Sequence, residues 1–254
     1  MAGLDAAGDE PLMLALALPA VPIIVGPSRY VSGRLAEERF GVTVHLLDDG
    51  FQHVQLERDV DLLVTDEHDV SDVPVPFGRL RERVTAASAA DAALVHGPDE
   101  GSAERVAQAL GLSRFFLLER ALGVPRMIAP HDDTAVPPRA NVLALAGIAR
   151  PERFFEDLRS AGWHVVATMR FRDHHRFTAA DVERITAATR SANAMVITTE
   201  KDAVRLAAQS LGGLTVAAMP LTVKVEPAAG FASWLRDRLD RARDSRHRER
   251  GAPS

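Results

Sequence analysis

Residues 141–169 read NVLALAGIARPERFFEDLRSAGWHVVATM, two apolar runs on either side of a charged run that begins with proline. The first run, NVLALAG (141–147), and the last, WHVVATM (163–169), predict buried strands. Pro151 suits the first turn of a helix, where no amide donor is needed, so a helix is predicted from Pro151 to Ala161. Apolar strands that alternate with helices indicate a parallel sheet covered on both faces.

The same alternation runs through the upstream half of the chain. The apolar stretch PLMLALALPAVPIIV (11–25) follows acidic residues and is interrupted by Pro19 and Pro22, which argues against a signal peptide or a membrane span. It predicts a short helix and then a buried strand, PIIV (22–25). A helix around residues 31–39 and a second buried strand, VTVHLL (42–47), follow. Further strands are predicted at 60–66, 91–96 and 114–119, with a helix at 101–110.

Downstream of residue 169 the pattern continues with strong helix signals. TAAD (178–181) is a capping-box start, and TTEKDAVRL (198–206) begins a second helix, in which Thr199 and Asp202 have the same spacing. The strands predicted here are AMVIT (194–198) and two short runs, LTVAAM and LTVKVE. A last helix starts near Ala228, and the charged residues after it predict a solvated end rather than an interaction arm.

These elements place the chain in the α/β class: a parallel sheet flanked by helices, with a second, smaller α/β domain. The polar, proline-containing segment APHDDTAVPPR (129–139) interrupts the alternation and is the predicted linker. The predicted domains are therefore residues 1–138 and residues 139–254, the latter ending in the C-terminal helix.

Composition excludes several functional classes. The 254 residues are 46% hydrophobic and 26% charged, as in an ordinary folded protein. A net charge of about −5 gives no reason to expect nonspecific nucleic-acid binding, so no nucleic-acid partner is predicted. The absence of cysteine excludes disulfides, thiolate metal sites and cysteine nucleophiles, and it is typical of a cytosolic protein.

The stretch LLDDGFQH (46–53) places two carboxylates after a predicted strand. Ligands of open parallel sheets bind outside the carboxyl ends of the strands, so Asp48 and Asp49 are expected to face the crevice. Paired carboxylates suit Mg²⁺, which prefers oxygen ligands and keeps waters that bridge to phosphates. The alternative is a turn in which Asp49 and Gly50 reverse the chain.

Six segments resemble the motifs of tetraacyldisaccharide 4'-kinases, the lipid A kinases of Gram-negative bacteria. They follow one another in family order from residue 8 to about residue 206. They are GDEPLMLA (8–15), DDGFQHVQLERDVDLLV (48–64), GRLRE (78–82), AGIARPERFFEDLRSAG (146–162), FRDHHRF (171–177) and TTEKDAVRL (198–206).

The resemblance implies a P-loop-kinase-like fold and an ATP-dependent phosphoryl transfer to the 4'-hydroxyl of a tetraacyldisaccharide 1-phosphate. It implies ATP and Mg²⁺ as cofactors and an acylated disaccharide phosphate as the lipid partner. It also implies a peripheral position at the cytoplasmic face of the inner membrane. Asp9 of the GDEP motif resembles the catalytic carboxylate of the family and His174 its partner. Such a pair can orient and deprotonate a sugar hydroxyl.

The other implied site residues serve the nucleotide and the phosphates. Asp48 and Asp49 resemble the acidic pair on the magnesium side, and Gln52 and His53 follow them on a loop directed toward nucleotide and substrate. Arg29 and Arg81 also match arginines of the family's active cleft, because guanidinium forks suit phosphate oxygens.

Each of these assignments has a structural alternative. An arginine such as Arg29 or Arg81 can simply be solvated, and His174 can be a turn or cap residue. His175 is expected to be structural. The helix start at Thr199 can bind an anion, although self-capping by Thr199 and Asp202 explains it more simply.

One part of the family pattern is missing from the sequence. The family's membrane-associating segment and phosphate loop, GxxxxGK[ST], should precede GDEP, yet no Gly-Lys dipeptide occurs in the chain. The fold is therefore expected to be incomplete at the N-terminus, and the isolated chain to bind ATP poorly and turn over little. GRLRERV also departs from the family's usual GPLREP.

Two other functional classes compete with the kinase. A noncatalytic module could recognise the acylated disaccharide phosphate without transferring phosphate. Alternatively, DHH (173–175) is a signature of metal-dependent phosphoesterases, with Asp48 and Asp49 as further ligands. The adjacent carboxylates and the lack of further ligand motifs argue against a phosphoesterase, whose metals need several spaced ligands.

Overall fold

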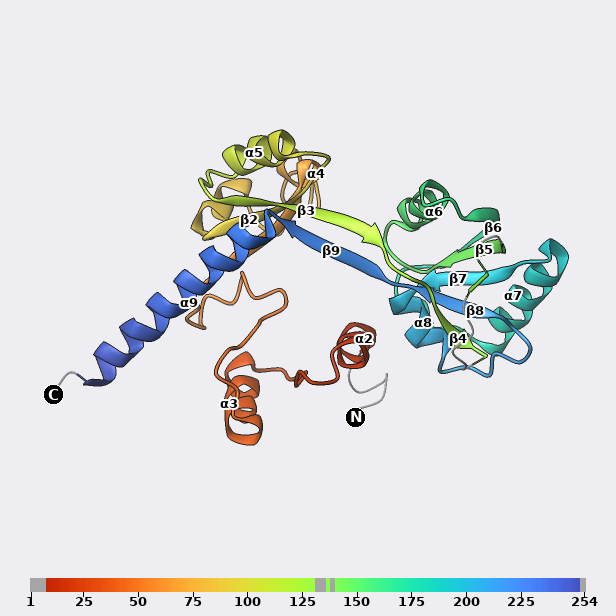
Figure 1. Ribbon diagram of the computed structural model, residues 1–254, viewed down its shortest axis with the longest axis horizontal. Helices are drawn as coiled ribbons and strands as arrows, with labels where there is room; N and C mark the ends of the chain where they lie inside the picture. The colour runs from red at the N-terminus through yellow and green to blue at the C-terminus, as the bar shows by residue number, and fades with distance from the viewer. Residues whose placement is uncertain (1–7, 131–135, 138–139, 252–254) are drawn as a thin grey trace. The chain divides into compact units, whose positions relative to one another are not determined.

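The computed structural model describes residues 8–130, 136–137 and 140–251, and side chains as far as residue 246. The described residues form a mixed α/β protein that divides into two compact units (Figure 1). The first unit comprises Met1–His45 and Ala121–Thr222, and the second comprises Leu46–Arg120 and Val223–Ser254. Each unit is built from two separate stretches of chain. The predicted boundary between residues 138 and 139 lies outside the described residues, as does most of the predicted linker, and stays a prediction.

The first unit contains a five-stranded sheet in the order β4-β8-β7-β5-β6. The β5, β6, β7 and β8 strands confirm four predicted strands and pair in parallel, whereas β4, which the sequence did not predict, pairs antiparallel with β8. The strands are β4 (Arg126–Ala129), β5 (Asn141–Ala146), β6 (His164–Arg170), β7 (Met195–Thr199) and β8 (Val216–Met219).

Helices cover both faces of this sheet, as the sequence predicted. On one face lies α6 (Pro151–Ser160), and α7 (Ala179–Ala192) and α8 (Glu200–Leu206) lie on the other (Figure 1). Successive residues of β5 point to opposite faces, so the strand is buried on both. Its residues 142, 144 and 146 pack against Phe155 and Leu158 of α6, while Leu143 and Leu145 pack with Ile185 and Leu206.

The second unit is built around a four-stranded sheet in the order β1-β2-β3-β9, in which β1, β2 and β3 run parallel. One face packs on α5 through Val106, and on the other Phe116 contacts Phe231 of α9 edge to face at 5.0 Å. Shorter helices lie at Glu67–Val70 (α4) and, in 3₁₀ form, at Val84–Ala89. The larger elements are β1 (Leu62–Asp66), β2 (Ala92–His96), β3 (Phe115–Leu122), β9 (Leu221–Glu226), α5 (Glu100–Ala109) and α9 (Ala228–Gly251).

Most described side chains of the C-terminal end are exposed, as predicted, and the backbone stays helical to Gly251, the last residue of α9. Two ion pairs fix it within its own unit: Arg238 pairs with Asp91, and Arg246 lies 2.5 Å from Asp59. Among the described residues, no helix is both long and apolar enough to cross a membrane.

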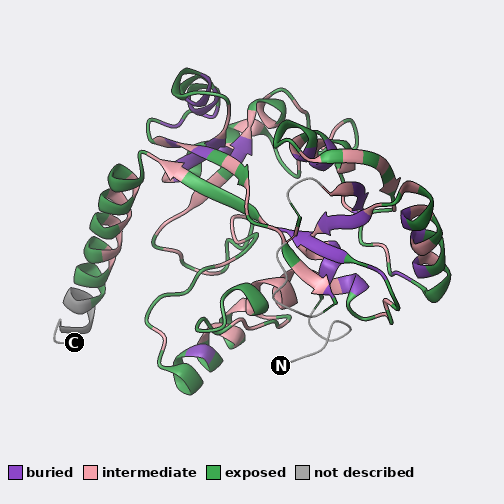
Figure 2. Cartoon of the chain, turned by 45° about the vertical axis from the view of Figure 1, so that its right-hand side comes forward, coloured by how far each residue is buried: buried purple, intermediate pink, exposed green. Residues whose placement is uncertain are grey.

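Two predicted strands are wrong. Helices α2 (Asp9–Ala17) and α3 (Arg29–Phe40) form as expected, but residues 22–25 and 42–47 have no strand structure, and Val44 and Leu46 are 63% and 94% exposed. A strand is completed by hydrogen bonds to a neighbour, which apolar composition cannot supply. In the described part of the chain neither segment has such a neighbour. Figure 2 shows how much of this region is exposed.

Phe155, which is 1% exposed, supports the α6 face of the first unit. We expect Phe155→Ala to lower the free energy of unfolding by about 3 to 5 kcal/mol, because the substitution removes buried apolar surface and leaves a cavity. Urea denaturation followed by circular dichroism measures this change. Phe77, which is 89% exposed, provides the matched control, and Phe77→Ala should cost less than about 0.5 kcal/mol. Equal effects of the two substitutions would show that α6 does not cover the core.

Candidate functional site

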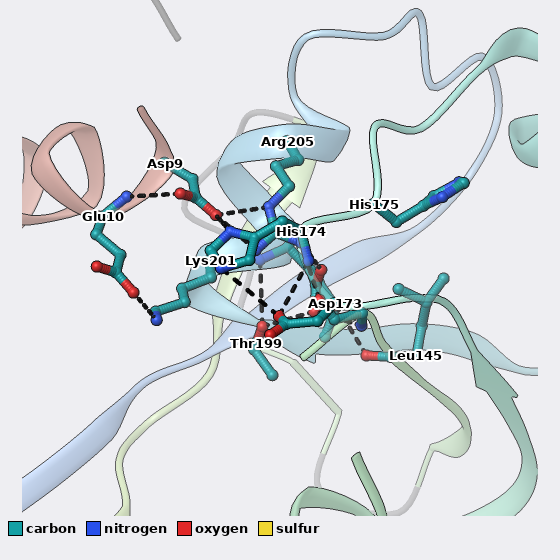
Figure 3. A network of polar contacts seen from close by, with 12 residues as sticks. Asp9, Glu10, Leu145, Asp173, His174, His175, Thr199, Lys201 and Arg205 are labelled. Atoms are coloured by element: carbon teal, nitrogen blue, oxygen red, sulfur yellow. Dashed lines mark hydrogen bonds and ion pairs between the residues drawn. The ribbon is translucent and has the colours of Figure 1, made fainter. Parts of the chain in front are cut away.

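The candidate site of the first unit lies where the start of α2 meets α8 and the loop between β6 and α7 (Figure 3). Asp9 is the first residue of α2, His174 follows β6, and Arg205 lies on α8. The β6 loop, Gly147 after β5 and the start of α8 after β7 all lie at the carboxyl edge of the parallel strands, which is where ligands of such sheets bind.

The structure brings together the two residues that the sequence proposed as a catalytic pair. Nδ1 of His174 lies 3.2 Å from Oδ2 of Asp9, and the other carboxylate oxygen, Oδ1, accepts the backbone amide of Glu10 at 3.1 Å. The side chain of His174 is 60% exposed, whereas that of Asp9 is 14% exposed. The imidazole is therefore open to a ligand while its carboxylate partner is sheltered.

The backbone of His174 is also unusual. Its φ of 55° lies in the left-handed region, which non-glycine residues seldom adopt, and Oδ1 of Asp173 accepts its amide at 3.0 Å. Strained backbone that its surroundings hold in place occurs often at functional sites. His175, by contrast, stacks on Phe171 and bonds to Asp181 at 2.9 Å, which confirms its predicted structural role.

Beneath this pair lies a buried polar cluster centred on Asp202, which has no exposed surface. One oxygen, Oδ2, accepts the Gly147 amide at 2.9 Å and the Thr199 hydroxyl at 2.8 Å. The other, Oδ1, accepts Nη1 of Arg205 at 2.9 Å. The Thr199 hydroxyl in turn accepts the amide of Asp202 at 3.1 Å, so the predicted self-capping of α8 is confirmed.

Arg205 connects the buried cluster to Asp9. Its side chain is 4% exposed, and Nε and Nη2 lie 2.8 and 2.5 Å from Oδ2 of Asp9. Nη1 also donates to the Gly147 carbonyl at 3.0 Å. Arg205 was not among the residues predicted from the sequence, although its motif, TTEKDAVRL, is one of the six that carry the family resemblance. At the rim of the cluster, Lys201 pairs with Glu10.

The two carboxyls have opposite pKa shifts. Burial is the largest influence on Asp9 and raises its pKa, but the hydrogen bond and charge of Arg205, with the charge of His174, outweigh it and hold the pKa below 3.8. Burial also dominates at Asp202 and there raises the pKa, despite the Gly147 amide, the Thr199 hydroxyl and the Arg205 charge. Asp9 is therefore ionised at neutral pH and able to accept a hydrogen bond from a hydroxyl.

The acidic pair of the second unit lies in a turn and not at the end of a strand. Asp49 has a φ of 52°, and Oδ2 of its carboxylate lies 3.4 Å from Nη2 of Arg81, with both side chains more than half exposed. The prediction that Asp48 and Asp49 end a strand is wrong, because residues 42–47 form no strand. The structure instead places Asp48 and Asp49 in a turn, as the alternative supposed, although no strand precedes it, and a second turn follows in which the His53 amide donates to the Gly50 carbonyl at 3.0 Å.

Two adjacent exposed carboxylates still fit the donor set of Mg²⁺, which binds through one or two carboxylates and keeps several waters. The described residues contain no group of three or more His, Asp and Glu side chains placed to hold a metal ion. Any magnesium site at Asp48 and Asp49 therefore depends on further ligands such as water or phosphate.

The remaining predicted site residues make local contacts. Gln52 donates to Glu82 at 2.9 Å, and His53 is exposed in the same loop of the second unit. Arg29, in the first unit, donates to the Gly26 carbonyl at 3.2 Å. Arg81 is 66% exposed and available to an anion apart from its contact with Asp49.

Comparison with known proteins shows the family to which the chain belongs. A family model described as "Tetraacyldisaccharide-1-P 4'-kinase" matches residues 2–240. The chain belongs to the tetraacyldisaccharide 4'-kinase family. This confirms the resemblance drawn from the six sequence motifs.

Individual members of the tetraacyldisaccharide 4'-kinase family are similar to this chain in sequence. The tetraacyldisaccharide 4'-kinase of Koribacter versatilis is 42% identical over 206 residues, which are 78% of this chain and 60% of that protein. That of Syntrophus aciditrophicus is 33% identical, covering 88% of this chain and 65% of the relative. The chain thus spans less than two thirds of either protein.

A solved structure of the family has the same fold. The crystal structure of LpxK from Aquifex aeolicus in complex with ATP superposes with a TM-score of 0.69 at 27% identity, covering 93% of this chain and 70% of that one. The expected α/β class is therefore confirmed both by the sheets and helices described above and by this similarity.

The lowered pKa of Asp9 predicts how its contribution to stability depends on pH. A carboxyl whose pKa is lower in the folded chain stabilises it fully above its unfolded pKa, and that contribution is lost as pH falls through the folded value. We therefore expect Asp9→Asn to lower the free energy of unfolding at about pH 6, with the difference from the natural chain shrinking below about pH 4. Urea denaturation at several pH values measures both chains.

Asp237→Asn, on the exposed surface of α9, is the matched control and should change the free energy of unfolding by less than about 0.5 kcal/mol at about pH 6. A difference between the natural chain and Asp9→Asn that stays constant across this pH range would contradict the lowered pKa.

Proposed function

We propose that this chain contributes the acceptor-side chemistry of an ATP-dependent kinase that phosphorylates the 4'-hydroxyl of a tetraacyldisaccharide 1-phosphate in lipid A biosynthesis. Membership of the family supports the reaction, and the contact between Asp9 and His174 is the observation that carries it. A carboxylate paired with an exposed imidazole at the carboxyl edge of a parallel sheet suits the activation of a hydroxyl group.

In this proposal Asp9 orients the acceptor. Oδ2 of Asp9 is engaged by His174 and Arg205, so the 4'-hydroxyl donates its hydrogen bond to Oδ1. As the hydroxyl oxygen bonds to the γ-phosphorus of ATP and the bond to the ADP oxygen breaks, the hydroxyl proton passes to the carboxylate. Phosphoryl transfer proceeds through a loose transition state, for which a modest base that mainly positions the nucleophile is sufficient.

Asp48 and Asp49 are the proposed magnesium ligands. The ion would neutralise charge on the transferred phosphoryl group. Arg29 and Arg81 are each proposed to bind phosphate oxygens of the nucleotide or of the acceptor's 1-phosphate, and Gln52 and His53 are proposed to contact the nucleotide or the acceptor. These assignments rest on the family motifs and on the exposure of Asp48, Asp49 and Arg81.

The acceptor also determines the proposed location. A disaccharide that carries four acyl chains is held in a lipid surface, so we propose that the protein acts as a peripheral protein at the cytoplasmic face of the inner membrane. Only the sugar and phosphate groups then need to reach Asp9 and His174.

The proposal is tested by phosphate transfer from radiolabelled ATP to a tetraacyldisaccharide 1-phosphate in mixed micelles with Mg²⁺. We expect labelled phosphate to appear on the lipid, and a high enzyme concentration makes even slow turnover measurable. Asp9→Ala should abolish the transfer, and His174→Ala should lower its rate by roughly 10²-fold or more.

His164→Ala is the matched histidine control, because His164 is exposed and contacts Asn141 in the same unit. It should keep the rate of the natural chain. If the natural chain and Asp9→Ala transferred phosphate equally, the kinase proposal would be overturned.

A second candidate function is a noncatalytic module that binds the acylated disaccharide phosphate through the exposed imidazole of His174. Titration of the lipid into the chain separates the two candidates. Binding of the lipid without measurable affinity for ATP and without transfer supports the module, whereas transfer supports the kinase.

Magnesium binding has a separate test. Mn²⁺ can replace Mg²⁺, and its electron paramagnetic resonance signal falls when it binds protein. In the presence of ATP we expect the double substitution Asp48→Asn and Asp49→Asn to reduce binding by roughly tenfold or more, because both proposed oxygen ligands lose their charge. Asp237→Asn is the control on α9. Unchanged binding in the double variant would exclude these two residues as ligands.

A further inference from the structure

Arg205 occupies an unusual place for an arginine of this chain. Its guanidinium is 4% exposed and contacts two carboxylates, Asp9 and Asp202, together with the carbonyl of Gly147. Arginine is seldom this deeply buried unless it is paired, and the partners must satisfy several of its donors. Here Nε and Nη1 donate hydrogen bonds, whereas Nη2 lies 2.5 Å from Oδ2 of Asp9 as an ion pair without a hydrogen bond of its own.

The contacts divide the guanidinium into two sides. Nη1 faces inward, to Oδ1 of Asp202 and the Gly147 carbonyl, whereas Nε and Nη2 face Oδ2 of Asp9. The inward side is anchored to a carboxylate that is itself held by the Gly147 amide and the Thr199 hydroxyl. The side facing Asp9 is therefore fixed relative to the carboxyl ends of β5 and β7.

We propose that Arg205 is a positioning residue, whose buried guanidinium holds the Asp9 carboxylate in one orientation and so presents Oδ1 to the acceptor hydroxyl. The inference rests on the proposed kinase function and deepens it. Neither the sequence motifs nor the comparisons assign a role to this side chain.

The orientation follows from how the two oxygens of Asp9 are used. Oδ2 has the two side-chain donors of the site, Arg205 and His174, while Oδ1 has the Glu10 amide. Rotation of the carboxylate would remove Oδ2 from Nε of Arg205 and leave a buried charge without its partner, which is costly. His174, which is 60% exposed, cannot supply such restraint alone.

The charges around Asp9 make Arg205 its main electrostatic partner. Asp9 and Asp202 are two carboxylates on either side of one guanidinium, so removing the guanidinium would leave like charges close together. The Lys201 charge is paired with Glu10. Among the described residues, the charged and titratable groups that act on Asp9 directly are Arg205 on α8 and His174 before α7; Asp202, Lys201, Asp173 and Glu10 belong to the same network through their own contacts and charges.

The test uses the full chain and four variants. Arg205→Met removes the charge and keeps much of the volume, while Arg205→Lys keeps the charge but loses the fork of donors. The double variant Asp202→Asn with Arg205→Met also removes the buried countercharge, which protects folding, since Asn can still accept the Gly147 amide. Arg170→Met is the matched control, because Arg170 pairs with Glu152 on the surface and is 60% exposed.

Two readouts are measured. The first is the titration of the Asp9 carboxyl carbon by NMR in the ligand-free chain, in which Arg205→Met and the double variant should raise the pKa of Asp9. The second is phosphate transfer from Mg-ATP to the tetraacyldisaccharide 1-phosphate. There we expect both variants to lower kcat by roughly 10²-fold with little change in KM, as for a misplaced catalytic group. Arg205→Lys should recover part of kcat, and Arg170→Met should behave like the natural chain.

The outcomes separate this inference from the proposed function. A double variant that folds normally and regains full kcat would show that Arg205 has a structural role alone, and would overturn the inference. An unchanged Asp9 titration in a folded Arg205→Met or double variant would overturn it as well. If the natural chain transfers no phosphate, the proposed function fails, yet the Asp9 titration still decides whether Arg205 controls that carboxylate.

Discussion

The candidate site depends on one buried ion pair, that between Asp202 and Arg205. A carboxylate without exposed surface and a guanidinium that is 4% exposed are both unfavourable in the interior unless each is paired and hydrogen-bonded. The amide of Gly147 and the hydroxyl of Thr199 complete the bonding of Asp202. With its inner side satisfied, Arg205 can direct its remaining donors to Asp9. The helix α2, which has no buried residue of its own, is thus held at the site by polar contacts.

Close packing at the end of β5 makes this pair possible. A Cβ atom on Gly147 would lie 3.0 Å from Oδ1 of Asp202 and 3.2 Å from the carbonyl of Arg172. These distances are shorter than ordinary contacts, so a side chain at this position would push Asp202 and the loop that carries His174 apart. Glycine therefore lets the backbone approach the carboxylate closely. The geometry of the Asp9–His174 pair is supported by backbone contacts beneath it as well as by its own hydrogen bond.

The sequence correctly predicted the helices and strands whose formation depends on neighbouring residues in the chain. The strand at 141–147 and the helix from Pro151 were correct because continuous apolar runs and a helix-starting proline need no knowledge of distant partners. The strands at 22–25 and 42–47 failed because a strand also needs a neighbour, and composition does not reveal one. The prediction that Asp48 lies at the end of a strand was wrong for the same reason, because residues 42–47 form no strand. The strand-end rule does hold for His174, which follows β6, a strand that does form.

Spacing alone could not have joined Asp9 to His174, since 165 positions separate them, and the family motifs supplied that link. The burial of Arg205 could not be predicted from the sequence for another reason. An arginine is expected at the surface unless a partner is present to receive it, and the partners here come from three separate segments of the chain.

The contact between Asp9 and Arg205 joins residues that are 196 positions apart. A ribosome has therefore synthesised most of the chain before the second member of this contact exists. At roughly 5 to 20 residues per second, Asp9 remains without its guanidinium partner for about 10 to 40 seconds of synthesis. A nascent chain therefore cannot complete this contact until Arg205 has been synthesised.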